Sequence, residues 1–286
     1  MTRRVGLLGK PLKRRHSPVM HDAAFDAAGI DARYVLLELE PEAVEDAVAA
    51  ARASDEWLGL GVTAPYKQVV ASLVDEVEPD ARAIGAVNNV VRTDDGRLIG
   101  FNTDAPGFRV GVELAMGRSL EDVDVVVIGA GGAAHAVVFA CLDAGARSVA
   151  VANRSVQRAA ALVERFAAVG QGSLTAVAAD DPALPDALAA ADLAVNATTV
   201  GMLDPGTTIP VEVLRPDATV FDLVYVPTET PLVAAARARG LRAANGSEML
   251  IAQAAIAFER WTGVGGMADV MRRAVAPLLA DPTVRA

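Results

Sequence analysis

The sequence predicts an α/β fold of two domains that is followed by a final helical segment. Short apolar runs of strand length alternate with longer helical stretches along most of the chain, an order that builds parallel sheets covered by helices. One apolar run, residues 124–128, leads through a glycine-rich turn into an Ala-rich helical stretch. The 286 residues suffice for two domains, and a content of 52% hydrophobic and 22% charged residues is typical of a folded globular protein.

The first part of the chain predicts an N-terminal α/β domain over residues 1–105. Its apolar runs predict strands over residues 5–8, 34–39, 58–62 and 86–91. Helical stretches are expected between them, over residues 18–28, 41–53 and 65–73.

The second part predicts a doubly wound domain over residues 106–244. Strands are expected near residues 125, 149, 174, 193 and 220, with helices from residues 155, 182 and 229. Two further helical stretches, over residues 247–261 and 267–279, follow without a strand between them. We therefore expect the C-terminal helices, residues 245–286, to pack back on the N-terminal domain.

Composition excludes several classes of protein. A formal net charge of −10 disfavours binding to nucleic acid. The single cysteine, Cys141, excludes a disulfide framework and lies in an apolar helical stretch, where a packed small residue is expected. The most apolar stretch is interrupted by Asp124, three glycines and His135, and the start of the chain lacks a signal-peptide pattern. We therefore expect a cytoplasmic protein without a membrane partner, and no spacing of His, Cys and carboxylates indicates a metal site.

The turn after residue 128 has the pattern of a dinucleotide-binding site. Between the predicted strand and helix, it reads Gly129-Ala130-Gly131-Gly132-Ala133. The first glycine permits the tight turn, and the second lets the backbone approach a pyrophosphate, which is then bound by free N–H groups at the helix N-terminus. The second domain is therefore predicted to be a Rossmann-type nucleotide-binding domain.

The end of the next predicted strand favours NADP(H) over NAD. An NAD site places Asp or Glu about 20 residues after the glycine turn, where the carboxylate accepts from the ribose 2′-hydroxyl. Here the segment reads Asn153-Arg154-Ser155. A carboxylate would repel a 2′-phosphate, whereas Arg154 and Arg158, one helical turn apart, can bind it through charge-assisted hydrogen bonds. The alternative is that both arginines are the solvated start of a helix.

Polar residues also gather in loops at the ends of the predicted N-terminal strands, where α/β proteins keep their chemistry. These loops are residues 61–67, 85–89 and 100–104. Together with residues 9–11, 17–21, 196–202, 222–232, 245–254 and 258–263, they resemble the shikimate dehydrogenase family. The resemblance covers nearly the whole chain, and it consists of several independent motifs in the same order.

This resemblance implies reversible hydride transfer between NADP(H) and a ring carbonyl, as between 3-dehydroshikimate and shikimate. Lys67 and Asp104 match the family's catalytic pair. Reduction of a ketone creates an alkoxide that must gain a proton as the hydride arrives, so a donor placed at the oxygen lowers the barrier. Lys67 would supply this proton, and Asp104 would hold the lysine and the substrate hydroxyl in register. The alternative is a surface ion pair of little energetic weight.

The resemblance also implies contacts with both ligands. In the N-terminal domain, which would bind the substrate, Ser17 matches one of two serines that hold the substrate carboxylate, while Thr63 and Asn88 match residues that hydrogen-bond its ring. Two residues match positions lining the same pocket, Tyr225 and Gln253. The loop near the nicotinamide ribose and the segment near the nicotinamide ring contribute Asn196, Thr198, Thr199, Gly246 and Met249. For each polar side chain, the alternative is a structural role in which its hydrogen bonds are formed within the protein.

The chain departs from the family pattern at two positions of the substrate site. Arg15 stands where the first carboxylate-binding serine is expected, and Gly61 replaces an asparagine that contacts a ring hydroxyl. A guanidinium binds a carboxylate bidentately but needs more room, which Gly61 would provide. The alternative is that Arg15 points to solvent, as part of a basic face with Arg3, Arg4, Lys10, Lys13 and Arg14.

Three functions remain open from the sequence. The first is an NADP-dependent shikimate dehydrogenase. The second is an oxidoreductase of the same type that acts on another cyclic hydroxy acid, such as quinate, aminoshikimate or a larger anion. The third is a protein that binds NADP and a ligand without turnover, since fold alone does not establish function. In each case the partner is a small molecule, and the chain is expected to be a monomer or a homodimer.

Overall fold

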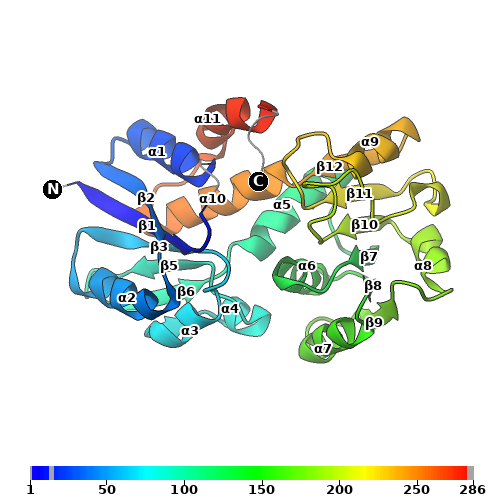
Figure 1. Ribbon diagram of the computed structural model, residues 1–286, viewed down its shortest axis with the longest axis horizontal. Coiled ribbons are helices and arrows are strands. Elements are labelled where there is room, and N and C mark those ends of the chain that lie inside the picture. The colour runs from blue at the N-terminus through cyan, green and yellow to red at the C-terminus, as the bar shows by residue number, and fades with distance from the viewer. Residues whose placement is uncertain (1, 13–15, 282–286) are drawn as a thin grey trace. The chain divides into compact units, whose positions relative to one another are not determined.

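The computed structural model describes residues 2–12 and 16–281, which form two compact units. The first unit contains the described residues up to Thr103 together with Ile251–Leu278. The second contains Asp104–Leu250 and the described residues after Leu278. Each unit is built on its own six-stranded sheet (Figure 1).

The sheet of the first unit has the strand order β2-β1-β3-β5-β6-β4. Its strands are β1 (Arg3–Gly9), β2 (Ala32–Glu38), β3 (Trp57–Val62), β4 (Glu76–Val77), β5 (Asn89–Arg92) and β6 (Leu98–Phe101). β5 runs antiparallel to both of its neighbours, whereas the other adjacent pairs are parallel. The start of β5 therefore lies at the same edge of the sheet as the ends of β1, β3 and β6.

Helices supply the remaining elements of the first unit. They are α1 (His16–Ala28), the 3-10 turn η1 (Pro41–Ala43), α2 (Val44–Ala53), α3 (Val69–Leu73), α4 (Pro79–Ile84) and most of α10 (Ser247–Thr262) and α11 (Ala268–Ala280). Leu8, Leu60 and Val90 form part of the core with residues of α2 and α3. The expected return of the C-terminal helices is visible in α10, because the Trp261 indole donates to the Val90 carbonyl of β5 at 2.9 Å.

The sheet of the second unit is entirely parallel and has the order β12-β11-β10-β7-β8-β9. Its strands are β7 (Asp124–Ile128), β8 (Ser148–Asn153), β9 (Ser173–Ala178), β10 (Leu193–Asn196), β11 (Thr219–Asp222) and β12 (Arg242–Asn245). The chain moves outward from β7 in one direction through β9 and then in the other from β10. The doubly wound prediction is therefore confirmed, and the switch point, where such sheets bind nucleotides, lies between β7 and β10.

The second unit contains α5 (Asp104–Met116), α6 (Gly132–Asp143), α7 (Val156–Phe166), α8 (Leu184–Ala190), the 3-10 turn η2 (Val211–Val213) and α9 (Pro231–Ala238). α6 is buried over most of its length, which explains its nearly continuous apolar sequence. Phe108 of α5 meets Phe221 of β11 edge to face, with ring centroids 5.6 Å apart. Among the described residues, no helix is long and apolar enough to cross a membrane.

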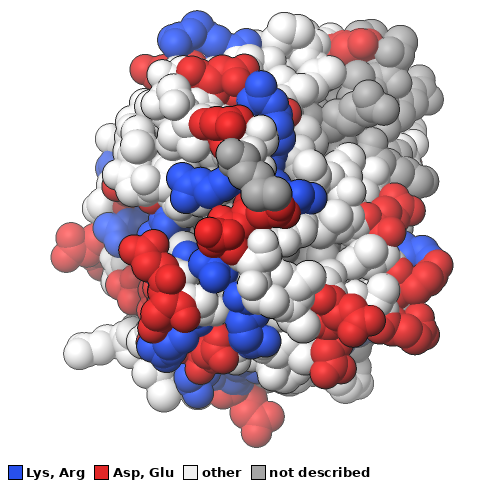
Figure 2. Space-filling model, turned by 90° about the vertical axis from the view of Figure 1, so that its left-hand side faces the viewer, with Lys and Arg blue, Asp and Glu red and all other residues white. Residues whose placement is uncertain are grey.

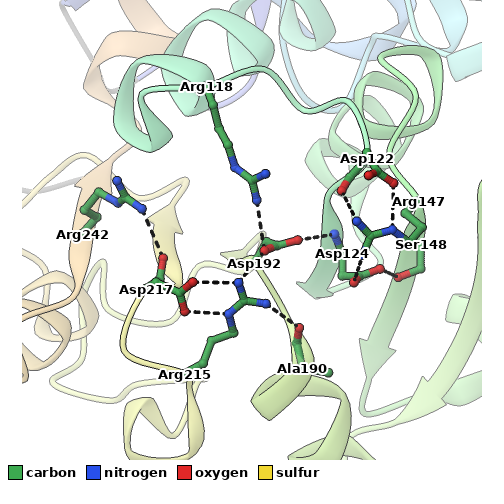
Figure 3. A network of polar contacts seen from close by, with 10 residues as sticks. All are labelled: Arg118, Asp122, Asp124, Arg147, Ser148, Ala190, Asp192, Arg215, Asp217 and Arg242. Atoms are coloured by element: carbon green, nitrogen blue, oxygen red, sulfur yellow. Dashed lines mark hydrogen bonds and ion pairs between the residues drawn. The ribbon is translucent and has the colours of Figure 1, made fainter.

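An ion-pair network joins the amino ends of the strands in this second sheet (Figure 3). The Asp192 carboxylate, 8% exposed, pairs with Arg118 and Arg215 at 3.0 Å each and accepts from the Asp124 N–H at 2.9 Å. A cavity of about 190 Å³ lies beside it, lined by residues that include these arginines. The cavity lies at the edge of the sheet opposite the glycine turn. Carboxylates beside it already form ion pairs with Arg118 and Arg215, so we assign the network a structural role.

The surface of the first unit mixes charges of both signs, as the face in Figure 2 shows. Arg4 pairs with Glu56 at 2.7 Å, and Lys10 pairs with Glu40. Two members of the expected basic face are therefore matched by carboxylates. Arg15 and its neighbours Lys13 and Arg14 lie outside the described residues.

Candidate active site

The glycine turn follows β7 at the switch point of the second sheet. Gly129 has φ +114°, a conformation that favours glycine, and its N–H donates to the Ala152 carbonyl of β8 at 2.8 Å. A Cβ atom at this residue would lie 2.9 Å from Thr198 Cγ2 and 3.0 Å from the Ala197 carbonyl oxygen. The turn therefore packs directly against the loop after β10, and Gly129 permits this close approach.

The N-terminus of α6 is open for a ligand. Gly131 is the N-cap and has no side chain with which to cap the helix, and Gly131, Gly132 and Ala133 are exposed. A Cβ atom at Gly131 or Gly132 would meet nothing within 4 Å. Ala134, by contrast, is fully buried. This arrangement fits a dinucleotide pyrophosphate, because the positive end of a helix attracts anions and the space beside Gly131 and Gly132 is open.

The end of β8 supplies two positive charges. Asn153 and Ser155 order the connection to α7: the Asn153 amide donates to the Ser155 carbonyl at 2.9 Å, and the Ser155 hydroxyl donates to Gln157 Oε1 at 3.0 Å. Arg154 precedes the helix and Arg158 lies in its first turn, and both are exposed. In the described part of the chain, neither guanidinium is paired with a carboxylate. Their charges thus fit a 2′-phosphate.

The loop after β10 is shaped by Asn196, which is 1% exposed. Its Oδ1 accepts from the Thr198 N–H at 3.1 Å and from the Thr198 hydroxyl at 2.7 Å. Its Nδ2 donates to the Val200 carbonyl and to Asp222 Oδ1. Asn196 thus uses its amide internally, whereas Thr199 is exposed and Thr198 is half-buried beside the glycine turn.

Asp222, at the end of β11, is a site-shaping residue that sequence reasoning missed. The fully buried carboxylate accepts from Asn196 at 2.8 Å, from the Val224 N–H at 3.1 Å and from the Thr230 hydroxyl at 2.6 Å. Thr230 also caps α9 by accepting from the Val233 N–H. Burial raises the pKa of Asp222, while these donors act in the opposite direction. The sequence does indicate this residue, because Asp222 follows a predicted strand and lies eight residues before the Thr-Pro start of a helix.

The loop after β11 and the turn after β12 also lie close together. A Cβ atom at Gly246 would lie 2.3 Å from the Leu223 carbonyl oxygen, so glycine is required there. Met249 is 8% exposed in the first turns of α10, and Tyr225 is half-buried after β11. Gln253 follows one helical turn after Met249 and is half-buried in the first unit.

In the first unit, the predicted substrate residues gather at one edge of the sheet. The Thr63 N–H donates to the Leu8 carbonyl at 2.8 Å, which joins the ends of β3 and β1. The Lys67 carbonyl accepts from the Val87 N–H at 3.0 Å, so the lysine turn lies beside the segment that carries Asn88. Lys67 is half-buried.

Asn88 links this edge to Thr103. Its Oδ1 accepts from the Thr103 N–H at 2.8 Å, and its Nδ2 donates to the Thr103 hydroxyl at 3.1 Å. The Asn89 Nδ2 donates to Asn88 Oδ1 and to the Thr103 hydroxyl, at 2.9 Å each. Asp104 follows Thr103 in the chain and begins α5. The backbone between Phe101 and Asp104 is thus fixed by a buried amide cluster.

The Tyr34 hydroxyl group occupies the space next to Gly61, while the room that Arg15 would need there stays a prediction, since Arg15 lies outside the described residues. A Cβ atom there would lie 2.6 Å from the Tyr34 hydroxyl oxygen and 3.2 Å from Leu7 Cδ1. The Tyr34 hydroxyl forms a side-chain hydrogen bond with Ser17, which is half-buried in the first turn of α1. Within residues 2–12 and 16–281, no group of three or more His, Cys, Asp and Glu side chains is placed to hold a metal ion.

Three family models match the chain. They are described as the shikimate dehydrogenase substrate binding domain, over residues 7–90, shikimate / quinate 5-dehydrogenase, over residues 113–202, and the shikimate 5′-dehydrogenase C-terminal domain, over residues 246–276. The shikimate dehydrogenase (NADP(+)) of Geobacter metallireducens is 40% identical over 280 residues, which cover 97% of each chain.

Solved structures agree with this assignment. Shikimate 5-dehydrogenase from Thermus thermophilus, in complex with NADP(H) and shikimate, is 37% identical with a TM-score of 0.82, and the match covers 95% of this chain and 99% of that chain. Quinate dehydrogenase from Corynebacterium glutamicum, in complex with NAD, is also 37% identical, with a TM-score of 0.88 and coverage of 96% and 99%. Three domain models match the chain, a relative is 40% identical over 97% of it, and a solved structure shares its fold over 95% of it, so the chain belongs to the shikimate dehydrogenase family.

Proposed function

We propose that this protein catalyses the NADP-dependent interconversion of 3-dehydroshikimate and shikimate. The observation that carries the proposal is the edge of the first sheet, where the Lys67 carbonyl is bonded to Val87 and the buried Asn88 amide to Thr103, the residue before Asp104 in the chain. Residues 1–105 would bind the substrate, residues 106–244 would bind the cofactor, and residues 245–286 would complete the substrate domain.

Lys67 is the proton donor in this proposal. When bound, NADPH supplies the hydride that reduces the ring carbonyl. The Lys67 ammonium then gives a proton to the carbonyl oxygen, and in the oxidation direction the amine takes the proton back from the hydroxyl. Asp104 accepts hydrogen bonds from the lysine and the substrate hydroxyl, which orients both groups. Asn88 fixes the backbone that carries Asp104, so it contributes through positioning as well as through contact with the ring.

The cofactor preference is assigned to Arg154 and Arg158. Both guanidinium groups are exposed at the end of β8 without a carboxylate partner in the described chain, and a 2′-phosphate would receive charge-assisted hydrogen bonds from them. We further propose that the protein acts in the cytoplasm, as a monomer or homodimer.

A second candidate is oxidation of quinate or another cyclic hydroxy acid. It is favoured by one specific observation, the 37% identity to a quinate dehydrogenase over nearly the full chain. The replacement of the expected asparagine by Gly61 also favours this candidate, because the Tyr34 hydroxyl then replaces the asparagine as the polar group beside the substrate ring.

Substitution of Lys67 tests the proposed reaction. We expect Lys67→Ala to lower kcat with shikimate by about 10²- to 10⁴-fold, while the dissociation constant for NADP, measured by titration calorimetry, stays within about twofold of the wild type. A variant that retains wild-type kcat would show that another group transfers the proton. Wild-type protein that binds NADP but oxidises none of a panel of cyclic hydroxy acids would support a binding protein instead.

A further inference from the structure

A carboxylate without a positive partner is buried at the edge of the second sheet that carries the glycine turn. Asp222, at the end of β11, is fully buried, and among the described residues no lysine, arginine or histidine forms an ion pair with it. Moving a carboxylate out of water is costly unless hydrogen bonds stabilise it. Neutral donors therefore do so, and they are the Asn196 amide, the Val224 N–H and the Thr230 hydroxyl.

The Asn196 amide has only one orientation that its neighbours satisfy. Its Nδ2 donates to Asp222 Oδ1 at 2.8 Å and to the Val200 carbonyl at 3.1 Å. Its Oδ1 accepts from the Thr198 N–H at 3.1 Å and from the Thr198 hydroxyl at 2.7 Å. These four bonds use both donors and both lone pairs of the amide. A reversed amide would place its oxygen against two acceptors and its nitrogen against the Thr198 N–H, so the orientation is fixed.

Thr198 continues this chain of hydrogen bonds to the glycine turn. Since its hydroxyl proton is donated to Asn196, its oxygen is left to accept, and it does so from the Val200 N–H at 3.1 Å. The Thr198 methyl group lies 2.9 Å from the position that a Cβ atom of Gly129 would take. Asp222 is thus linked, through Asn196, to the loop that packs on the turn at the switch point, where such sheets bind nucleotides.

We propose that Asp222 is a positioning residue for NADP, acting by fixing the orientation of the Asn196 amide and, through it, the loop of residues 196–200 against the glycine turn. Asp222 and Asn196 then act on the cofactor through this loop, not by contact with it. The inference rests on the proposed function for its cofactor site only, so it is independent of which cyclic hydroxy acid is the substrate.

The test is the dissociation constant for NADP, measured by titration calorimetry on the whole protein without substrate. We expect Asp222→Ala to raise this constant about tenfold, because the Asn196 amide loses the acceptor that orients it. Asp222→Asn should stay within about threefold of the wild type, since an amide oxygen at the position of Oδ1 still accepts from Asn196 and Val224.

Asp192→Ala is the matched control, because Asp192 is also a buried carboxylate beside this sheet that accepts from a backbone N–H, but at the opposite edge. Both alanine variants should lose stability in urea unfolding, whereas only Asp222→Ala should weaken NADP binding. Thr230→Val separates the two oxygens of Asp222, because it removes the donor to Oδ2 and leaves Oδ1 in place. This variant should bind NADP within about twofold of the wild type.

Four results would overturn the proposal. They are unchanged NADP binding in folded Asp222→Ala, equal weakening in the two alanine variants, equal weakening in Asp222→Ala and Asp222→Asn, and weakened binding in Thr230→Val. If Asp222→Ala does not fold, Asn196→Ala, which removes the oriented amide itself, should weaken NADP binding about tenfold. Binding of NADP by that variant as tightly as by the wild type would overturn the proposal as well.

Failure of the proposed function gives a different result. If the wild type itself does not bind NADP, the proposed cofactor site fails and the inference falls with it. A wild type that binds NADP, with Asp222→Ala folded and binding it equally well, overturns the inference and leaves the proposed function in place.

Discussion

Buried His21 should make the stability of this protein depend on pH in the mildly acidic range. The imidazole is 3% exposed between the rings of Tyr34 and Trp261, and among the described residues its Nδ1 has no hydrogen-bond partner. Burial lowers the pKa of His21 from 6.5 to about 3. The folded protein therefore holds this ring neutral, whereas the unfolded chain protonates it below pH 6.5.

The difference in the pKa of His21 between the folded and unfolded states fixes the direction and the size of the pH effect on stability. Between pH 6.5 and about pH 3, the unfolded state binds one proton more than the folded state, so stability is complete above pH 6.5 and is lost as the pH falls. The limiting slope is about 1.4 kcal/mol per pH unit. Integration from pH 7.5 to pH 5.0 gives a loss of about 2 kcal/mol in the free energy of unfolding from His21 alone.

The assay compares urea unfolding of the wild type and of His21→Phe between pH 7.5 and 5.0. Phenylalanine keeps an aromatic ring against Tyr34 but has no proton to bind. Both proteins retain His16 and His135, so the difference between the two pH profiles isolates His21. We expect the stability of the variant, relative to the wild type, to increase by about 2 kcal/mol as the pH falls to 5.0.

A matched control is His135→Asn, which changes a half-buried histidine of the second unit. The pH profile of this variant measures how much acid sensitivity comes from a histidine other than His21. If His21→Phe and the wild type lose stability in parallel over this range, the imidazole is protonated in the folded state, and the argument from burial is refuted.

Three further predictions concern the second unit and the central chemistry. Arg154→Ala and Arg158→Ala should each raise KM for NADP about tenfold without raising KM for NAD, as measured by initial rates. Asp192→Ala should cost about 1–3 kcal/mol in urea unfolding, because the Asp124 N–H loses its acceptor, whereas removal of the exposed Asp217 carboxylate should cost measurably less. Gly129→Ala should abolish NADP binding in calorimetry, because its Cβ would meet the Ala197 carbonyl at 3.0 Å.

Most of the fold was predictable because hydrophobic patterning and the glycine turn act locally. The six strands of the second sheet include five that the sequence predicts, and β12 was missed because its four residues, Arg242–Asn245, are largely accessible and lack an apolar run. In the first unit, the sequence does not predict β4 because it has only two residues, nor β6, whose last two residues fall in the segment interpreted as the polar loop 100–104. The helix expected over residues 65–73 begins only at Val69, since turns follow Pro65.

The site was predictable in its motifs but not in its contacts. The approach of Gly129 to Thr198 joins residues far apart in the sequence, and no local pattern indicates it. Tyr34 was read as a strand residue because aromatic residues are common in strands, so its hydroxyl beside Gly61 was not foreseen. The helix expected from residue 155 begins at Val156, so Arg154 precedes α7, as the sequence predicts.

The most direct test of the central claim is the rate of NADPH formation from NADP and shikimate at neutral to mildly alkaline pH, with quinate and NAD measured alongside. The account predicts a kcat of about 1 s⁻¹ or more with shikimate, and a higher kcat/KM for shikimate with NADP than for quinate or for NAD. Absence of turnover with shikimate, while NADP still binds, would contradict it.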